Sequence, residues 1–155
     1  MIPLDLHAFL TEVRSASAHT DHDLEAEVAG VVRDLGLPHV VGADFVGSGG
    51  GAPASVVVTN RGMPFLGVVV CREPEPAEAL AAVTSMSQVV LVVIDGHRWR
   101  SSWPALRRIH SLWERRVIAG VYTVLSLDEL RADIERFALL RRIPTRRQVL
   151  RSRTA

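Results

Sequence analysis

Lysine is absent from this chain of 155 residues, and cysteine occurs only once. All 18 basic residues are arginines, so no lysine is present to form a Schiff base, bind a phosphate or activate a water molecule. The single cysteine, Cys71, excludes an internal disulfide and is typical of a reducing compartment. The opening residues MIPLDLHAFLTEV contain an acid and no basic region, unlike a secretory signal. These features favour a cytoplasmic bacterial protein.

Long apolar runs are also missing. No window approaches the roughly 18 uninterrupted apolar residues of a membrane-spanning helix, so no membrane partner is expected. Hydrophobic residues nevertheless make up 48% of the chain and charged residues 23%, which are ordinary values for a globular protein with a core. The length and composition therefore predict one compact α/β domain.

Charge is unevenly distributed along the chain. Residues 1–135 hold eleven arginines against 17 acidic residues, whereas residues 136–155 hold seven arginines and no acid. We interpret this as a domain over residues 1–140 followed by a basic arm over residues 141–155. Such an arm can neutralise several phosphates, which favours nucleic acid or another polyanion as partner. The alternative is that its arginines pair with acids of the same domain or of a partner subunit.

Hydrophobic periodicity predicts alternating helices and strands. Helices are expected over residues 4–14, 19–36, 75–87, 101–116 and 127–142. Strands are expected over residues 38–47, 55–60, 64–71, 88–96 and 119–126, with a hairpin turn at Asn60-Arg61-Gly62. The run over 88–96 is continuously apolar, as in a strand buried on both faces. This order predicts a mixed central sheet with an antiparallel three-strand meander, a crossover helix and flanking helices on both faces.

Capping signals predict where two of the helices begin and one of them ends. Thr20 or Asp21 can N-cap the first long helix. Ser126 with Glu129 has the spacing of a capping box that opens the last helix. Pro144 is expected to break that helix.

The order of elements, together with the hairpin text PASVVVTNRGMPFLGVVVCREPE over residues 53–75, resembles the PD-(D/E)XK nuclease-like superfamily, also called the restriction-endonuclease-like fold. That fold has a core of a helix, three antiparallel strands, a crossover helix and a further strand, and the resemblance covers residues 21–125. It implies a restriction-endonuclease-like fold and an origin in Mg²⁺-dependent phosphodiester hydrolysis.

The catalytic set that the resemblance implies is missing. Carried onto this sequence, the family's aspartate falls near Ala54 or Ser55, its glutamate on Val69 and its lysine on Cys71. The chemistry needs two carboxylates to hold Mg²⁺ through oxygen ligands. Valine binds no metal, and a cysteine sulfur is a soft ligand poorly suited to Mg²⁺. We therefore expect a catalytically degenerate member, a pseudoenzyme without a cofactor.

A relocated catalytic site is the alternative. Asp44 ends the strand before the hairpin, Glu73 follows it, and Glu25 or Glu27 resembles a metal-binding glutamate that some family members carry on the first helix. Arg72 can replace the lysine as a charge stabiliser, but with a pKa above about 12 it is a poor proton acceptor. In this alternative the chain is a Mg²⁺-dependent nuclease.

The densest aromatic and basic region covers residues 95–116. Its tryptophans and arginines can stack on bases and contact phosphates. Leu106, Ile109 and Trp113 share one helical face there and are expected in the core. With the arm, this region supplies the predicted nucleic-acid-binding residues: Arg98, Trp99, Arg100, Trp103, Arg107, Arg108, Arg141, Arg142, Arg146, Arg147 and Arg151.

Two short motifs have ordinary structural explanations beside functional ones. GSGGGAP over residues 47–53 can cradle a phosphate, but it lacks the Lys-Ser/Thr of a P-loop and a plain loop is the alternative. HTDHD over residues 19–23 can bind a metal or simply cap a helix.

Taken together, these patterns predict a non-catalytic nuclease-like module that contacts nucleic acid or a partner subunit, including a homo-oligomer, in a bacterial DNA-processing or defence system. A purely structural protein-interaction subunit is the other alternative.

Overall fold

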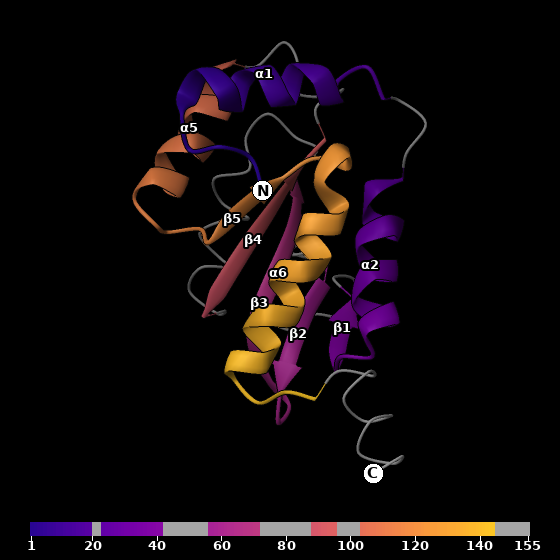
Figure 1. Ribbon diagram of the computed structural model, residues 1–155. Helices are drawn as coiled ribbons and strands as arrows, with labels where there is room; N and C mark the ends of the chain where they lie inside the picture. The colour runs from indigo at the N-terminus through magenta and orange to yellow at the C-terminus, as the bar shows by residue number, and fades with distance from the viewer. Residues whose placement is uncertain (20–22, 42–55, 72–87, 96–102, 145–155) are drawn as a thin grey trace, which may run out of the picture.

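The computed structural model describes residues 1–19, 23–41, 56–71, 88–95 and 103–144 (Figure 1). Within these ranges the elements are, in order, α1 Leu6–Ala16, α2 Leu24–Leu35, β1 His39–Val41, β2 Val56–Asn60, β3 Met63–Cys71, β4 Val89–Ile94, α5 Trp103–Glu114, β5 Gly120–Tyr122, the 3-10 helix η2 Val124–Ser126 and α6 Leu127–Leu140. Each α-helix and strand overlaps a segment predicted as that type. The helix expected over residues 75–87 lies outside the described residues.

The described strands form one sheet in the order β1-β2-β3-β4-β5. β1 pairs antiparallel with β2, and β2 pairs antiparallel with β3. β4 is parallel to β3, and β5 is parallel to β4. The predicted mixed sheet with an antiparallel three-strand meander is therefore confirmed.

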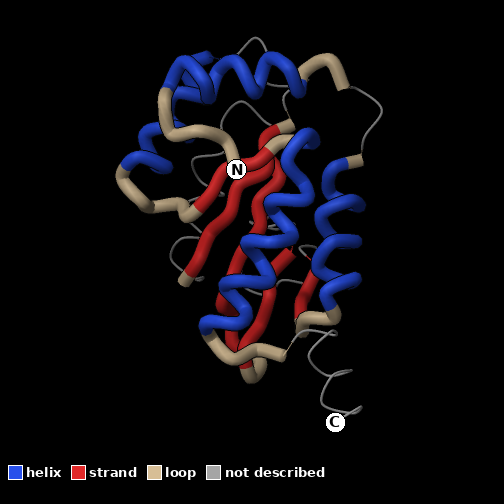
Figure 2. Tube along the Cα trace, in the orientation of Figure 1, coloured by secondary structure: helices blue, strands red, loops and turns tan. Residues whose placement is uncertain are grey.

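Helices cover both faces of this sheet (Figures 1 and 2). α2 and α6 contact each other and share one apolar cluster with the sheet. α1 and α5 contact each other and share a second cluster on the opposite face. The result is three layers, helices, sheet and helices, with an apolar core on each side of the sheet.

β4 is buried on both faces, as its continuous apolar sequence predicted. Leu91 and Val93 face α2 and α6, whereas Val90, Val92 and Ile94 face α1 and α5. All five side chains are at most 3% exposed. Burial of each contributes roughly 1.5–3 kcal/mol relative to exposure, so this strand is a large part of both cores.

The hairpin between β2 and β3 closes with the tight turn that the sequence predicted. Asn60 pairs with Met63, which leaves Arg61 and Gly62 as the two turn residues. Their φ angles are 53° and 79°. Two consecutive positive φ angles define a type I′ turn, the form whose twist matches that of the paired strands.

A β-bulge follows the turn on β3. Val58 lies opposite Leu66, but the next residue, Thr59, lies opposite Pro64, so Phe65 is the extra residue. The bulge places Phe65 on the same side of the sheet as Leu66, facing α2 and α6, where strict alternation would have directed it to the other face.

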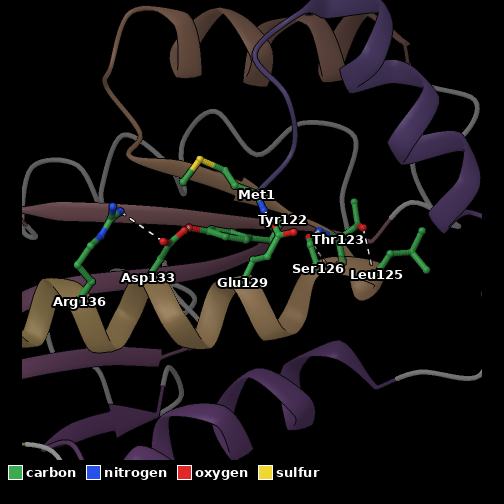
Figure 3. A network of polar contacts seen from close by, with 8 residues as sticks. All are labelled: Met1, Tyr122, Thr123, Leu125, Ser126, Glu129, Asp133 and Arg136. Carbon is green, nitrogen blue, oxygen red and sulfur yellow. Dashed lines mark hydrogen bonds and ion pairs between the residues drawn. The ribbon is translucent and has the colours of Figure 1, made fainter.

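A polar network joins α6 to β5 (Figure 3). The hydroxyl of Tyr122, a residue with no exposed surface, donates a 2.5 Å hydrogen bond to Oδ2 of Asp133. Oδ1 of Asp133 lies 3.3 Å from the guanidinium of Arg136, and the amino group of Met1 pairs with Glu129. Burial, together with the Asp133 carboxylate, raises the pKa of Tyr122, so its phenol stays protonated and donates. These contacts add polar links between α6 and β5 to the apolar packing of the helix.

The N-terminal residues and α1 are joined to the other side of the sheet. The amide of Ile2 donates a 3.0 Å hydrogen bond to the carbonyl of Val121 on β5. His110 of α5 is 5% exposed, and its Nε2 contacts the carbonyl oxygen of Leu4. Its Nδ1 lies 2.8 Å from Oε1 of Glu114. These contacts hold the segment before α1 against β5 and α5.

Two predicted caps are corrected by the structure. The N-cap of α2 is Asp23, whose Oδ1 accepts a 3.2 Å hydrogen bond from the amide of Ala26. An N-cap residue directly precedes the first turn of its helix. Because α2 begins at Leu24, neither Thr20 nor Asp21 is in that position. Ser126 is the N-cap residue of α6, as predicted, but its side chain makes no capping hydrogen bond there, so the predicted capping box with Glu129 does not form.

Ser126 instead belongs to η2, where the sequence predicted the end of a strand. Its Oγ accepts a 2.9 Å hydrogen bond from the amide of Thr123, and Oγ1 of Thr123 accepts one of 3.2 Å from the amide of Leu125. This reciprocal pairing ends β5 at Tyr122.

Gly120 has no side chain, and the Tyr122 ring occupies the space where its Cβ atom would lie. A Cβ atom at position 120 would lie 2.5 Å from the Tyr122 hydroxyl oxygen and 2.9 Å from two ring carbons. We therefore expect Gly120→Ala to displace the ring and lower the free energy of unfolding by about 1–3 kcal/mol, as overpacking of a core does. Equilibrium urea unfolding measures the change.

Gly30 on α2 is the matched control for this substitution. A Cβ there meets no atom within 4 Å. Gly30→Ala should leave stability unchanged or raise it by about 0.5–1 kcal/mol, because alanine is the better helix former. Equal destabilisation by both substitutions would contradict the steric explanation.

Candidate nucleic-acid interface

Two of the hairpin positions that the resemblance makes catalytic are described, and both lie inside the protein. Val69 is 4% exposed and Cys71 is 2% exposed, and both belong to the apolar cluster shared with α1 and α5. Burial raises the pKa of the Cys71 thiol to about 12, so the thiol is neutral at physiological pH. The side chains of the cluster around the thiol are apolar and offer no further metal ligand. Ser55 lies outside the described residues.

Among the acidic residues of the relocated-site alternative, only the two glutamates of α2 lie in the described part of the chain. Glu25 is exposed on α2, which packs on the opposite face of the sheet from the two buried hairpin positions. Asp44, Arg72 and Glu73 lie outside the described residues. In the part of the chain that the structure describes, no group of three or more His, Cys, Asp or Glu side chains is placed to hold a metal ion.

Both tryptophans at the ends of α5 are half-buried. The guanidinium carbon of Arg14, on α1, lies 5.5 Å from the centre of the Trp103 ring, a cation–π distance. These two residues line a surface hollow of about 290 Å³ with Val13 and Ser17. Trp113 packs against the core cluster shared by α1 and α5, in agreement with its predicted core position.

The predicted α5 arginines are exposed. Arg107 and Arg108 lie on the side of the helix away from its buried stripe of Ala105, Leu106, Ile109 and His110. The structure thus leaves both accessible to a partner. The other predicted residues of this region, Arg98, Trp99 and Arg100, lie outside the described residues, as do Arg146, Arg147 and Arg151 of the arm.

A second surface lies where the hairpin turn and the C-terminal end of α6 meet, and we call it the basic end. Its residues are Arg61, Met63, Leu140, Arg141 and Arg142. The guanidinium carbon of Arg141 lies 5.7 Å from the centre of the Phe65 ring, which joins the helix end to the start of β3. In Figure 1 the two segments lie together at the lower edge of the molecule. Arg141 and Arg142 were predicted from charge, and the fold adds the hairpin residues to them.

The arginines of the basic end have no acidic partner among the residues that the structure describes. Within residues 1–19, 23–41, 56–71, 88–95 and 103–144, no carboxylate forms an ion pair with Arg61, Arg141 or Arg142. By contrast, Arg131 lies 3.3 Å from Asp34, and Arg136 is paired on α6. The positive charge at the end of α6 is therefore not neutralised by the described part of the domain.

Two of these arginines occupy a backbone conformation that favours glycine. Arg61 has a φ of 53° and Arg142 a φ of 56°. Arg142 follows α6 at the position where the Ile143 amide bonds the Ala138 carbonyl at 2.9 Å, the pairing of a Schellman motif. A left-handed conformation costs a residue with a Cβ about 1–2 kcal/mol. Arginine side chains are therefore present at two exposed positions where glycine would be more stable.

Sequence reasoning missed three residues of this surface: Arg61, Met63 and Leu140. The turn was recognised, but its closeness to the end of α6 depends on the order of strands and on the Phe65 bulge. The one local signal was an arginine ahead of glycine in a two-residue turn, where asparagine or aspartate is usual.

No protein-family model, curated protein or solved structure matches this chain. The described helices include none that is both long and apolar enough to cross a membrane. The candidate site is therefore defined by the chemistry of this chain's own residues.

The left-handed position of Arg142 generates a stability prediction. Arg142→Gly should raise the free energy of unfolding by about 1 kcal/mol, because glycine adopts this φ angle without a Cβ clash. Urea unfolding monitored by tryptophan fluorescence measures the change. Arg141→Gly is the matched control, since Arg141 has a φ of −99° and gains nothing from glycine. A loss of stability in both variants would contradict the assigned strain.

Proposed function

We propose that this chain is a non-catalytic binding module of the restriction-endonuclease-like type, and that its basic end and arginine-rich arm bind nucleic acid. The setting is a bacterial DNA-processing or defence system, by analogy with the superfamily that the sequence resembles.

The arrangement of elements supports this assignment. The superfamily core begins with a helix and an antiparallel three-strand meander, which α2 and β1 to β3 match in order. Its further strand corresponds to β4, which is parallel to β3. Helices on both faces of the sheet are consistent with the same fold.

The buried hairpin supports the loss of catalysis. A nuclease of this type needs carboxylates at the strand positions occupied here by Val69 and by the residue near Ser55, and a charged amine in place of Cys71. The described positions contribute to an apolar core instead. The relocated alternative depends on Asp44 and Glu73.

The single observation that carries nucleic-acid binding is the unneutralised charge at the end of α6. Arg61, Arg141 and Arg142 have no carboxylate partner among the described residues, and the rest of the arm, residues 143–155, adds four more arginines without an acid. Phosphates are the ligands that such a cluster attracts most strongly, through release of counterions. For Arg141 and Arg142, this argues against the alternative in which the arm pairs with acids of its own domain.

A protein-interaction subunit is the second candidate, and one observation favours it. Met63 is 68% exposed and Leu140 is 72% exposed beside the arginines of the basic end. Exposed methionine and arginine side chains are common at protein interfaces. Binding of a protein in place of an oligonucleotide would identify this function.

Truncation after Pro144 tests the role of the arm. It removes Arg146, Arg147, Arg151 and Arg153, and it retains Ile143, which is 3% exposed in the core. If all four arginines contact phosphates, the slope of log K against log salt should fall in magnitude by about 3–4 units, about 0.9 for each contact. Fluorescence anisotropy with a labelled oligonucleotide at several salt concentrations measures it. An unchanged slope would exclude the arm from the interface.

Absence of cleavage is the second expected result. Incubation of plasmid and single-stranded DNA with the full chain and Mg²⁺ or Mn²⁺ should give no products, since the described hairpin positions hold no metal ligand. EDTA-sensitive cleavage that is lost in Asp44→Ala would overturn the proposal in favour of the relocated nuclease.

A further inference from the structure

We propose that the basic end takes single-stranded nucleic acid in preference to duplex. This inference rests on the proposed function and deepens it, because it names the form of nucleic acid that this surface fits. It depends on three features of the same five residues: their charge, their exposed apolar groups and the contact that holds Arg141.

The exposed apolar groups are the first feature. Met63 and Leu140 are among the most exposed large apolar side chains of the described residues, at 68% and 72%. They belong to the same surface as arginines that attract phosphates. A duplex presents a charged backbone and stacks its bases inside, so its phosphates offer these groups no apolar surface. A single strand can turn its bases outward, so apolar side chains next to phosphate-binding arginines have something to contact.

The position of Arg141 is the second feature. Its guanidinium lies over the Phe65 ring while the residue as a whole is exposed. This contact orders the head group before a ligand binds, which reduces the entropy that binding has to overcome. An ordered, exposed guanidinium is a stacking surface for an unpaired base. The side chain can therefore contact a base as well as a phosphate.

The positive charge of the basic end argues against a second copy of this chain, related by two-fold symmetry, as its binding partner. In a two-fold interface the same surface meets itself, so Arg61, Arg141 and Arg142 of one copy would face those of the other. None of the three has a carboxylate partner in the described part of the chain to offset the repulsion. A polyanion would neutralise this charge instead of adding to it. A single-stranded nucleic acid would in addition bring bases that the exposed apolar side chains can contact.

The test compares one labelled oligonucleotide, single-stranded or annealed to its complement, by fluorescence anisotropy on the full chain. The wild type should bind the single strand about tenfold more tightly. The double substitution Met63→Ser with Leu140→Ser should lower single-strand affinity by about tenfold and leave duplex affinity unchanged, since it removes contacts to bases and no charge. Urea unfolding verifies that the variant is folded.

Two controls separate apolar contact from charge. Leu125 is 48% exposed on η2, at the other end of α6 from the basic end, so Leu125→Ser should change neither affinity. Arg141→Gln should weaken both forms, and the single strand more, because the arginine has a stacking role only there. Loss of duplex affinity alone in this variant would contradict that role.

The outcomes distinguish this inference from the proposed function. Equal affinity for both forms, insensitive to the double substitution, would overturn the inference and leave nucleic-acid binding by charge in place. Absence of binding to either form would overturn both. Tight binding to vesicles of anionic lipid, or to an acidic peptide, without binding to the oligonucleotide would likewise overturn both and identify the basic end as a membrane or protein contact.

Discussion

Burial of the central strands on both faces is the constraint on which the rest of this structure depends. Side chains of β4 and of most of β3 alternate between two apolar cores, one shared with α2 and α6 and the other with α1 and α5. A charged group in the middle of either strand would lose its hydration without gaining a partner, at a cost of several kcal/mol. Val69 and Cys71 satisfy this constraint, and by satisfying it they leave no place for metal-binding chemistry on the inner part of β3.

Because of the same constraint, exposed polar side chains lie beyond the ends of the buried strand segments. The hairpin turn lies beyond the buried part of β3, and α6 is held against the sheet by its apolar face and by the hydrogen bond from Tyr122 to Asp133. Phe65 completes the arrangement: the bulge directs its ring toward α6, where Arg141 lies over it. The basic end is therefore built from a turn, a bulge and a helix end, while the strand interiors contribute only its support.

Much of the fold was predictable because its signals are local. The apolar run of β4 and the tight turn after Asn60 each depend on residues within a few positions of one another. The capping box was wrong for the same reason: Ser126 does precede α6, and its spacing to Glu129 fits the motif, but its hydroxyl is already bonded to the amide of Thr123. Where two local motifs could use the same side chain, the backbone geometry of the folded chain decides which hydrogen bond forms.

The amino-acid sequence is enough to show that lysine is absent, that residues 55–71 contain no carboxylate and that arginine is in excess after residue 135, since these are matters of composition and order. Tertiary structure alone decided which arginines share a surface and which are neutralised. Phe65 and Arg141 are 76 positions apart in the chain, and the contact between them joins the hairpin to the end of α6. Ion pairing and exposure are properties of that long-range packing, and no short stretch of sequence encodes them.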